Sequence, residues 1–188
     1  MKTLNQYIKE KLIINKDYRG VKIVVKSFDE LRKIIEDRYD KLGPGTEQKP
    51  IDFNDIDVSN LDSFCDKNEG IFQKTQFKYI DISDWNVSNA ESMRGMFSWC
   101  TELKSVGNIS DWDVSKVDNM SYMFAFCKKF NQDISNLDVS NVTNMYCMFQ
   151  YCKNFNQDLS GWNVSNVTVP YGIFYQCPIK EEYKPKFK

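Results

Sequence analysis

The chain of 188 residues contains no histidine. This absence excludes the Ser-His and Cys-His nucleophile pairs, the zinc sites that use imidazole ligands, and the side chain that most often moves protons near neutral pH. Net charge is also nearly absent, since 25 basic residues face 26 acidic ones, so the protein lacks the basic excess typical of nucleic-acid or anionic-membrane binding. The absence of histidine and the near absence of net charge predict a binding protein that is not an enzyme and needs no cofactor.

Long apolar runs are missing as well. The first twelve residues, MKTLNQYIKEKL, alternate lysines with apolar residues and lack the continuous apolar core of an export signal. No segment approaches the ~20 apolar residues that cross a membrane. If Met1 is the native start, we expect a cytoplasmic or particle-associated protein without membrane insertion. A native N-terminus further upstream would instead allow a location at the cell surface.

What the sequence has in abundance is repetition. Residues 120–144 and 145–169 match at 15 of 25 positions without a gap, and 93–119 follows the same pattern with two extra residues. One valine of each repeat marks the period, at spacings of 29, 27, 25 and 25 residues: Val58, Val87, Val114, Val139 and Val164. A repeat this short cannot bury its own apolar face, so neighbouring repeats must stack into a solenoid.

Each repeat contains two periodic segments. Met120, Met123, Phe124 and Cys127 are spaced as i, i+3, i+4 and i+7, which predicts a short helix. The segment 130–134 alternates apolar and polar residues, which predicts a half-buried strand. Five such strands would stack into a parallel sheet about 20–25 Å long. The fold class predicted is therefore α/β, a solenoid of short strand plus short helix units.

The repeat also resembles a known family. The pattern Met-Phe-x-x-Cys-x-x-Phe-Asn-x-Asp-Ile-Ser-x-Trp-Asp-Val-Ser-Asn-Val is clearest at 96–117, 123–142 and 148–167. It is similar to the BspA-like leucine-rich-repeat family of bacterial surface proteins, in particular its 25-residue branch of unknown function, over roughly residues 52–177. The resemblance implies a leucine-rich-repeat-like solenoid and, for the family, adhesin or host-interaction roles in secreted or lipid-anchored proteins.

Residues 1–50 do not repeat. A capping box at Thr3 predicts a first short helix, Val21–Val25 a strand, and a second capping box at Ser27 a helix of about four turns that ends at Gly43. A solenoid exposes the apolar end of its first repeat, so this α/β region is predicted to cap the repeat that contains Phe53. The alternative is an attachment or packaging tag. The predicted organisation is a cap over 1–50, about five repeats over 51–178, and a tail over 179–188.

Four of the six cysteines recur with the repeat: Cys100, Cys127, Cys152 and Cys177. A zinc site needs ligands that converge on a tetrahedron, which a column does not provide, so no metal site is expected. Disulfides are not expected either, because equivalent Cα–Cβ vectors are parallel and packed helices would stand about 8–10 Å apart. The column is predicted to be free and buried. Cys147, off the column, is the only candidate for a reactive thiol, without a histidine to activate it.

Polar residues recur on the predicted strands, as Asn131 with Asp133 and Asn156 with Asp158. Paired carboxylates serve glycoside hydrolysis, and Asn/Asp ladders bind Ca²⁺. Catalysis needs residues in different roles, however, and these residues repeat one role. Hydrogen bonding to turns is the expected function, with a polar recognition face as the alternative.

Aromatic residues form the second candidate surface. Trp99, Phe126 and Tyr151 precede the cysteine column, and Tyr122 and Tyr146 lie nearby. They serve either inter-repeat packing or, if partly exposed, as anchors for protein or stacking platforms for sugar. The expected function is therefore a non-catalytic protein-interaction module that binds an unidentified protein partner. The alternatives are a carbohydrate-binding, adhesin-type module and a structural component packaged in a phage-like particle.

Overall fold

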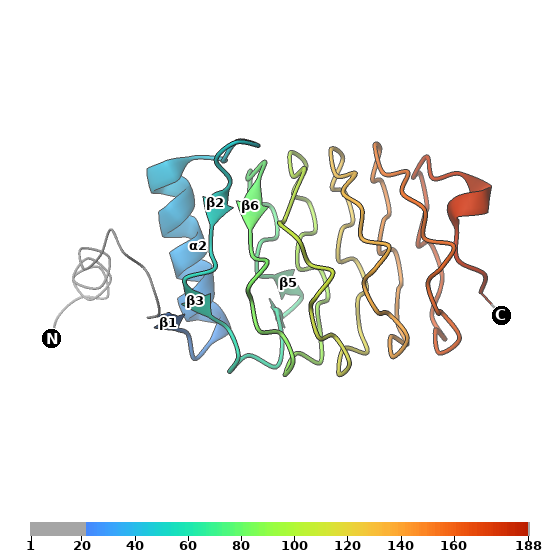
Figure 1. The fold of residues 1–188 in the computed structure, drawn as a ribbon, viewed down its shortest axis with the longest axis horizontal. Coiled ribbons are helices and arrows are strands. Elements are labelled where there is room, and N and C mark those ends of the chain that lie inside the picture. The colour runs from blue at the N-terminus through green and yellow to red at the C-terminus, as the bar shows by residue number, and fades with distance from the viewer. Residues whose placement is uncertain (1–21, 188) are drawn as a thin grey trace, which may run out of the picture.

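The computed structural model describes residues 22–187 as a mixed α/β chain with short elements. The predicted helix at Thr3 lies outside the described residues. The elements are β1 (Ile23–Val24), α2 (Phe28–Leu42), β2 (Ile51–Asp52), β3 (Ile56–Asp57), β4 (Cys65–Asp66), β5 (Glu69–Gly70), β6 (Ile80–Asp81) and a 3₁₀ helix, η1 (Glu181–Tyr183). Most of the remaining chain runs in passes that lie side by side along the long axis (Figure 1).

The long helix predicted after Ser27 is confirmed. The Ser27 hydroxyl accepts a hydrogen bond from the Glu30 backbone N–H, as an N-cap residue does, and α2 begins at the next residue. The helix ends at Gly43, whose φ of 73° is readily adopted only without a side chain. Leu31, Ile34 and Ile35 are buried, so the predicted apolar side of the helix faces the core.

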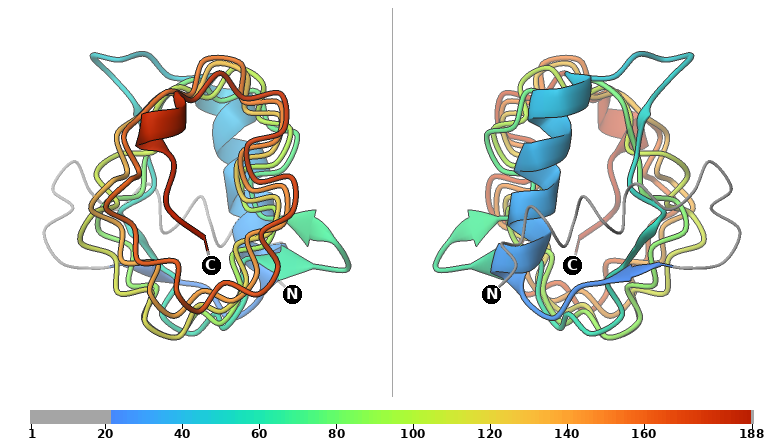
Figure 2. Two further views of the ribbon diagram at one scale, coloured as in Figure 1. Left: turned by 90° about the vertical axis from the view of Figure 1, so that its right-hand side faces the viewer. Right: turned by 90° about the vertical axis from the view of Figure 1, so that its left-hand side faces the viewer.

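Each repeat makes one pass of the chain, here called a rung: 64–92, 93–119, 120–144 and 145–169. Parallel backbone bridges join equivalent residues of successive rungs, from Ser63 through Ser92, Asn119 and Asn144 to Val169. Viewed along the stack, the rungs superimpose as a ring (Figure 2). The antiparallel hairpin β4–β5 protrudes from this ring and accounts for the longest repeat spacing.

Every rung has two halves. The turn half comprises 70–78, 93–104, 120–130 and 145–155, and the loop half comprises 79–92, 105–119, 131–144 and 156–169. The N–H groups of Tyr122, Phe124 and Phe126 all donate to carbonyls of the next rung. The N–H groups of Met123, Ala125 and Cys127 donate instead to the residue three positions earlier.

The short helix predicted in each turn half is therefore wrong. A helix would use all of these N–H groups within one segment, whereas stacking takes every second one for the neighbouring rung. Consecutive turns place the residues i, i+3, i+4 and i+7 on one side, as a helix does, so the apolar pattern does not distinguish the two structures. The first turn half accordingly has one residue with positive φ, Lys74, and each of the other three has two, for example Tyr122 at 58° and Phe126 at 63°.

The strand prediction is correct only at the N-terminal end of the stack. There β2 pairs in parallel with β6, and Tyr79 forms a bridge with Ser105. Residues 130–134 form no strand, because the Gln132 side chain occupies the position of a backbone partner. Its Oε1 accepts from Val106 N at 2.9 Å, and its Nε2 donates to Gly107 O at 2.6 Å.

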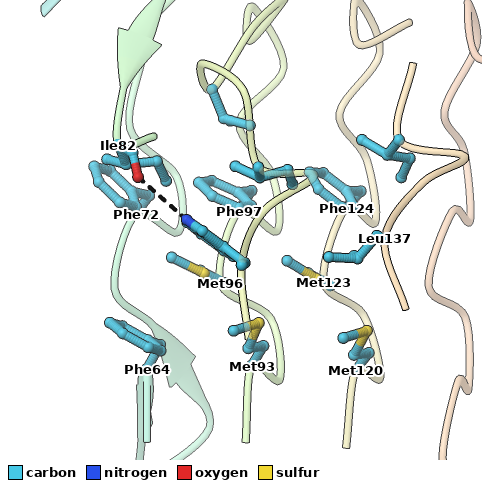
Figure 3. Packing of buried hydrophobic residues seen from close by; sticks show 14 of the residues in the cluster. Phe64, Phe72, Ile82, Met93, Met96, Phe97, Met120, Met123, Phe124 and Leu137 are labelled. Carbon is cyan, nitrogen blue, oxygen red and sulfur yellow. Dashed lines mark hydrogen bonds between the residues drawn. The ribbon is translucent and has the colours of Figure 1, made fainter. Parts of the chain in front are cut away.

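The core is a single cluster of stacked apolar columns (Figure 3). Phe72, Phe97 and Phe124 stack with ring centroids 5.4 and 5.2 Å apart. The methionines align beneath them, with Met96 above Met93 and Met123 above Met120 in the view of Figure 3. Equivalent residues of neighbouring rungs thus bury one another, which no single repeat achieves alone.

The described part of the N-terminal region packs on the first repeat. β1 pairs in parallel with β3, and the Tyr39 ring of α2 meets the Phe77 ring edge-on at 5.0 Å. Arg38 forms an ion pair of 2.6 Å with Asp55. Helix α2 thereby covers one end of the stack, while η1 lies at the other end (Figures 1 and 2). The boundary at residue 50 stays a prediction from the sequence.

Candidate functional site

Three of the predicted binding residues form one continuous feature, which we call the aromatic ladder: Trp99, Phe126 and Tyr151. The Trp99 and Phe126 rings stack at 3.9 Å between centroids with planes 8° apart, and the Phe126 and Tyr151 rings at 4.8 Å with planes 18° apart. Trp99 is 44% exposed, while Phe126 and Tyr151 are half-buried. The ladder thus combines inter-rung packing with partial exposure, and Tyr175 extends it edge-on at 5.5 Å.

The backbone at the ladder adopts a conformation that bulky residues avoid. Trp99, Phe126 and Tyr151 have φ of 63°, 63° and 58°. An L-residue in this left-handed region costs about 1–2 kcal/mol relative to the right-handed one. Each ring pair returns about 0.5–1.5 kcal/mol. Stacking between rungs therefore offsets the backbone strain and fixes the rings in one orientation.

Mutual stacking decides what the ladder presents to solvent. The planes are nearly parallel, so the ring faces are turned toward neighbouring rings and the edges toward solvent. Sugar-binding platforms stack a sugar on an open ring face, whereas here the faces between Trp99, Phe126 and Tyr151 cover one another. An edge surface with rigid aromatic anchors is more typical of protein recognition.

Tyr122 and Tyr146 form a second, smaller pair in the same turn halves. Their rings meet edge-on at 5.2 Å, and Tyr146 is 38% exposed. The Arg94 guanidinium lies 5.7 Å from the centre of the Tyr122 ring and donates to the Asn68 side chain. The structure therefore places all five predicted aromatic residues in the turn halves of three rungs.

The lysines of the turn halves were missed in the sequence analysis. Lys128 and Lys153 directly follow cysteines of the column, and Lys129 follows Lys128. All three are exposed, and Lys153 Nζ lies 5.2 Å from the centre of the Tyr151 ring. Lys74 occupies the ladder position of the first rung. The signal that would have found them is the Cys-Lys pairing at 127–128 and 152–153, which recurs with the repeat.

The predicted polar residues lie in the loop halves, apart from the ladder, and their side chains hold turns. Asp133 and Asp158 each accept from the backbone N–H two residues later, at 2.9 Å in both cases. Asn131 Oδ1 accepts from Asn156 N at 2.9 Å, and Asn156 Oδ1 accepts from Lys180 N at 2.9 Å. These residues satisfy backbone groups within and between rungs, as the turn interpretation predicts.

The carboxylates of this set are poorly suited to acid catalysis. Hydrogen bonds from the backbone and side chain of Ser135 hold the pKa of Asp133 below its ordinary value. Hydrogen bonds from Ser160 lower the pKa of Asp158 in the same way. A general acid near neutral pH needs a raised pKa. The two carboxylates are therefore ionised turn residues at neutral pH.

The cysteine column has a structural role. Cys100, Cys127 and Cys152 are buried, and each thiol lies 2.9 Å from a backbone carbonyl oxygen of the preceding rung, to which it donates. All six cysteines are free thiols. The rungs are joined by backbone hydrogen bonds and so lie closer than the helix spacing we expected, yet the column forms no disulfide.

Thiol reactivity is suppressed by the surroundings. Burial raises the pKa of the Cys100 thiol to about 12 and also raises the pKa of Cys147. A raised pKa keeps the thiol protonated and lowers its reactivity. Within residues 22–187, no three cysteine, aspartate or glutamate side chains come together as a metal site would require.

One surface pocket lies between α2 and the first rung, with a volume of about 220 Å³. Arg32, Tyr39 and Lys74 are among the residues that line it. The Arg32 guanidinium is already engaged, since it donates to the carbonyls of Ile71 and Gln73. None of the helices in the described part of the chain is both long and apolar enough to cross a membrane.

Comparison with known proteins identifies the repeat region. No curated protein and no solved structure shows a significant match to the chain. A family model, described as Mycoplasma protein of unknown function, DUF285, matches residues 66–185. This match begins within the first rung and extends beyond η1, so it covers the aromatic ladder and the loop halves together. Because it spans more than half of the chain, the protein belongs to the DUF285 family.

Proposed function

We propose that the stacked rungs form a leucine-rich-repeat-like solenoid of the BspA-like type, and that it works as a non-catalytic protein-interaction module. Parallel bridges that repeat from rung to rung and columns of equivalent core residues support the solenoid. The long recurring motif supports the BspA-like relationship. A stack of this kind presents an extended, rigid surface, which is how repeat proteins bind partners.

The observation that carries the proposal is the aromatic ladder. Buried rings could stack on one another equally well, yet the rings of the ladder are partly exposed. Trp99 leaves 44% of its surface in solvent. Rigid aromatic anchors lose little conformational entropy on binding and dominate the energetics of protein interfaces. The polar side chains of the loop halves are, by contrast, engaged in holding turns.

Site-specific photo-cross-linking tests the proposal. A benzophenone amino acid at position 126 samples the ladder, and the same group at Asn136 samples the exposed loop half of the same rung. Irradiation in a lysate of the source cells should give a discrete protein adduct from position 126 that position 136 lacks. Trp99→Ala and Tyr151→Ala should each reduce this adduct severalfold.

Two outcomes would refute the proposal. Equal adducts from both positions would show that the ladder has no special role. A surface that gives no protein adduct but binds glycans saturably, with binding lost in Trp99→Ala, would instead identify a carbohydrate-binding module.

A further inference from the structure

The near-neutral net charge conceals a separation of charge between the two halves of the rungs. From residue 70 to 169, the turn halves contain seven basic residues and one acidic residue, Glu102: Lys74, Lys78, Arg94, Lys104, Lys128, Lys129 and Lys153. The loop halves contain one lysine, Lys116, and nine acidic residues: Asp81, Asp84, Glu91, Asp111, Asp113, Asp118, Asp133, Asp138 and Asp158. Stacking of equivalent residues turns this alternation in sequence into one basic and one acidic side.

The basic side coincides with the aromatic ladder. Lys128 and Lys129 follow Phe126 in the same rung, Lys153 follows Tyr151, and all three lysines are exposed. Lys153 Nζ lies near the Tyr151 ring and within 3.2 Å of the Gln176 side-chain oxygen, so this ammonium group is held beside the ladder. Aromatic anchors and cations thus share one surface that runs along the stack.

The exposed ring edges add to the preference for negative charge. An aromatic ring carries partial negative charge on its faces and partial positive charge at its edge. Stacking turns the faces of Trp99, Phe126 and Tyr151 toward one another and their edges toward solvent. Edges and ammonium groups therefore both attract carboxylates, while the flat aromatic surface that a cation or sugar would need is mostly covered.

We propose that this surface binds an extended acidic segment of a protein partner, with carboxylates beside the lysines and apolar side chains against the ladder. The proposal rests on the protein-interaction function above and adds the chemistry of the partner. From Lys74 to Lys153 the surface covers three rung spacings, about 14 Å at the ~4.8 Å spacing of hydrogen-bonded parallel chains. About four to five residues of extended chain cover that length.

The test uses the full chain and a fluorescent peptide of about ten residues in which Glu alternates with Leu and Phe. Fluorescence anisotropy should show saturable binding that weakens as salt rises, because the contacts involve exposed charges. The same peptide with Gln in place of Glu should bind about tenfold more weakly or worse. Lys128→Glu combined with Lys153→Glu should also reduce affinity about tenfold or more.

Lys116→Glu is the matched control, since it reverses the one lysine of the loop halves and should change affinity less than about twofold. Circular dichroism of each variant checks that the rungs remain folded. Equal effects of Lys116→Glu and the double variant would overturn the proposal. So would equal binding of the Glu and Gln peptides, or equal affinity for a DNA duplex of the same charge, which would indicate a general polyanion site.

Two further outcomes separate this proposal from the protein-interaction function. If position 126 gives a protein adduct but the acidic peptide does not bind, the interaction module stands and the acidic partner is wrong. If sedimentation shows self-association that the Lys128→Glu and Lys153→Glu variant abolishes, the acidic segment is the loop half of a second copy, and the proposed separate partner is wrong.

Discussion

Single residues of the aromatic ladder show how stacking overrides local conformational preference. Phe126 combines a φ of 63° with ring contacts on both sides, to Trp99 and Tyr151. Its own preference opposes this backbone, and only its neighbours in the adjacent rungs compensate. At the ends of the stack the equivalent positions carry Lys74 and Gln176. A residue at either end has a neighbouring ladder ring on one side only.

Substitutions at Phe126 should separate strain from stacking. Phe126→Ala removes both ring contacts but keeps a side chain in the left-handed region, so we expect it to lower the free energy of unfolding by about 2 kcal/mol. Phe126→Gly removes the same contacts and the strain, so it should be about 1 kcal/mol more stable than Phe126→Ala. Urea unfolding followed by circular dichroism measures both values.

Ala125→Gly is the control for this comparison. Ala125 is buried and is not among the residues with positive φ, so glycine there should destabilise by about 0.5–1 kcal/mol. If Phe126→Gly were less stable than Phe126→Ala, the left-handed strain at the ladder would be refuted.

The sequence predicted part of the candidate site. The recurrence of Trp99, Phe126 and Tyr151 before the cysteine column was enough to group them, and their partial exposure was one of the two expected outcomes. The direction of the rings was not predictable, because it depends on a left-handed backbone that bulky residues rarely adopt. The basic side was overlooked because whole-chain charge averages over the two halves of each rung.

At the scale of elements, the turn halves take the place of the expected helices. Alternate residues there form inter-rung hydrogen bonds that run the same way, from N–H groups of one rung to carbonyls of the next. The carbonyls of Met96 and Ser98 accept from Phe72 and Lys74 of the preceding rung, so the equivalent carbonyls of the first rung face the N-terminal end of the stack. Arg32 of α2 donates to two of these first-rung carbonyls, Ile71 O at 2.8 Å and Gln73 O at 3.2 Å. A cation from the capping helix therefore satisfies the acceptors that stacking leaves open.

Removal of this guanidinium should destabilise the N-terminal end. Arg32→Met leaves partly buried carbonyls without a donor, which we expect to cost about 1–3 kcal/mol of unfolding free energy. Arg32→Lys keeps the charge but not the planar set of donors, so its effect should be intermediate. Lys33→Met alters an exposed neighbour on the same helix and should change stability by less than about 0.5 kcal/mol. Equal stability of the Met and Lys variants at position 32 would argue against the hydrogen-bond role.

We expect aspartates of the loop halves to contribute to the pH dependence of stability. Hydrogen bonds from Ser140 lower the pKa of Asp138, as those from Ser135 lower that of Asp133. A carboxylate with a lowered pKa in the folded state stabilises the protein above its unfolded pKa of about 4, and this contribution is lost as pH falls toward the folded value. The free energy of unfolding should therefore decrease between about pH 5 and pH 3.

Asparagine substitutions test this assignment, because asparagine keeps an acceptor for the turn but does not titrate. Denaturant unfolding of the variant with Asp133→Asn and Asp138→Asn should show a shallower loss of stability in acid than the parent chain. Asp84→Asn is the control, since Asp84 is an exposed aspartate of the first loop half. If the unfolding free energy of the double variant falls with pH as steeply as that of the parent chain, the acid sensitivity belongs to other carboxylates.

An element was predicted correctly where the residues that determine it lie within its own sequence. Helix α2 was predicted correctly because its capping residue, apolar side and terminal glycine all lie within its own sequence. The repeat helices, and the strands of the later rungs, were predicted wrongly because the hydrogen bonds that decide them join residues about 25 positions apart. Gln132 is the clearest case, since a side-chain amide there replaces a backbone partner that the alternating pattern had implied.

At the scale of the whole molecule, the stack has two different ends. Helix α2 and Arg32 cover the carbonyl end, whereas among residues 22–187 no backbone acceptor pairs with the N–H groups of Gly172, Phe174 and Gln176 at the other end. Pro170 occupies the first position of that row and has no N–H to offer. Each internal rung, by contrast, contacts only its two neighbours, so the number of internal rungs is not fixed by either end.

Duplication of one rung should therefore lengthen the molecule without changing its fold. A second copy of residues 120–144 inserted after Asn144 preserves every junction and adds one set of parallel bonds, one thiol of the cysteine column and one ring of the ladder. Because stability in stacked repeats is the sum of rung and interface contributions, the added rung should raise the unfolding midpoint. The denaturant slope should rise in proportion to the added chain. Small-angle scattering should show an increase in length of about 5 Å, the spacing of hydrogen-bonded chains. The control is insertion of the same 25 residues in scrambled order, which should lower the unfolding midpoint. If the duplicated chain were no more stable than this control, the stacked-rung architecture would be contradicted.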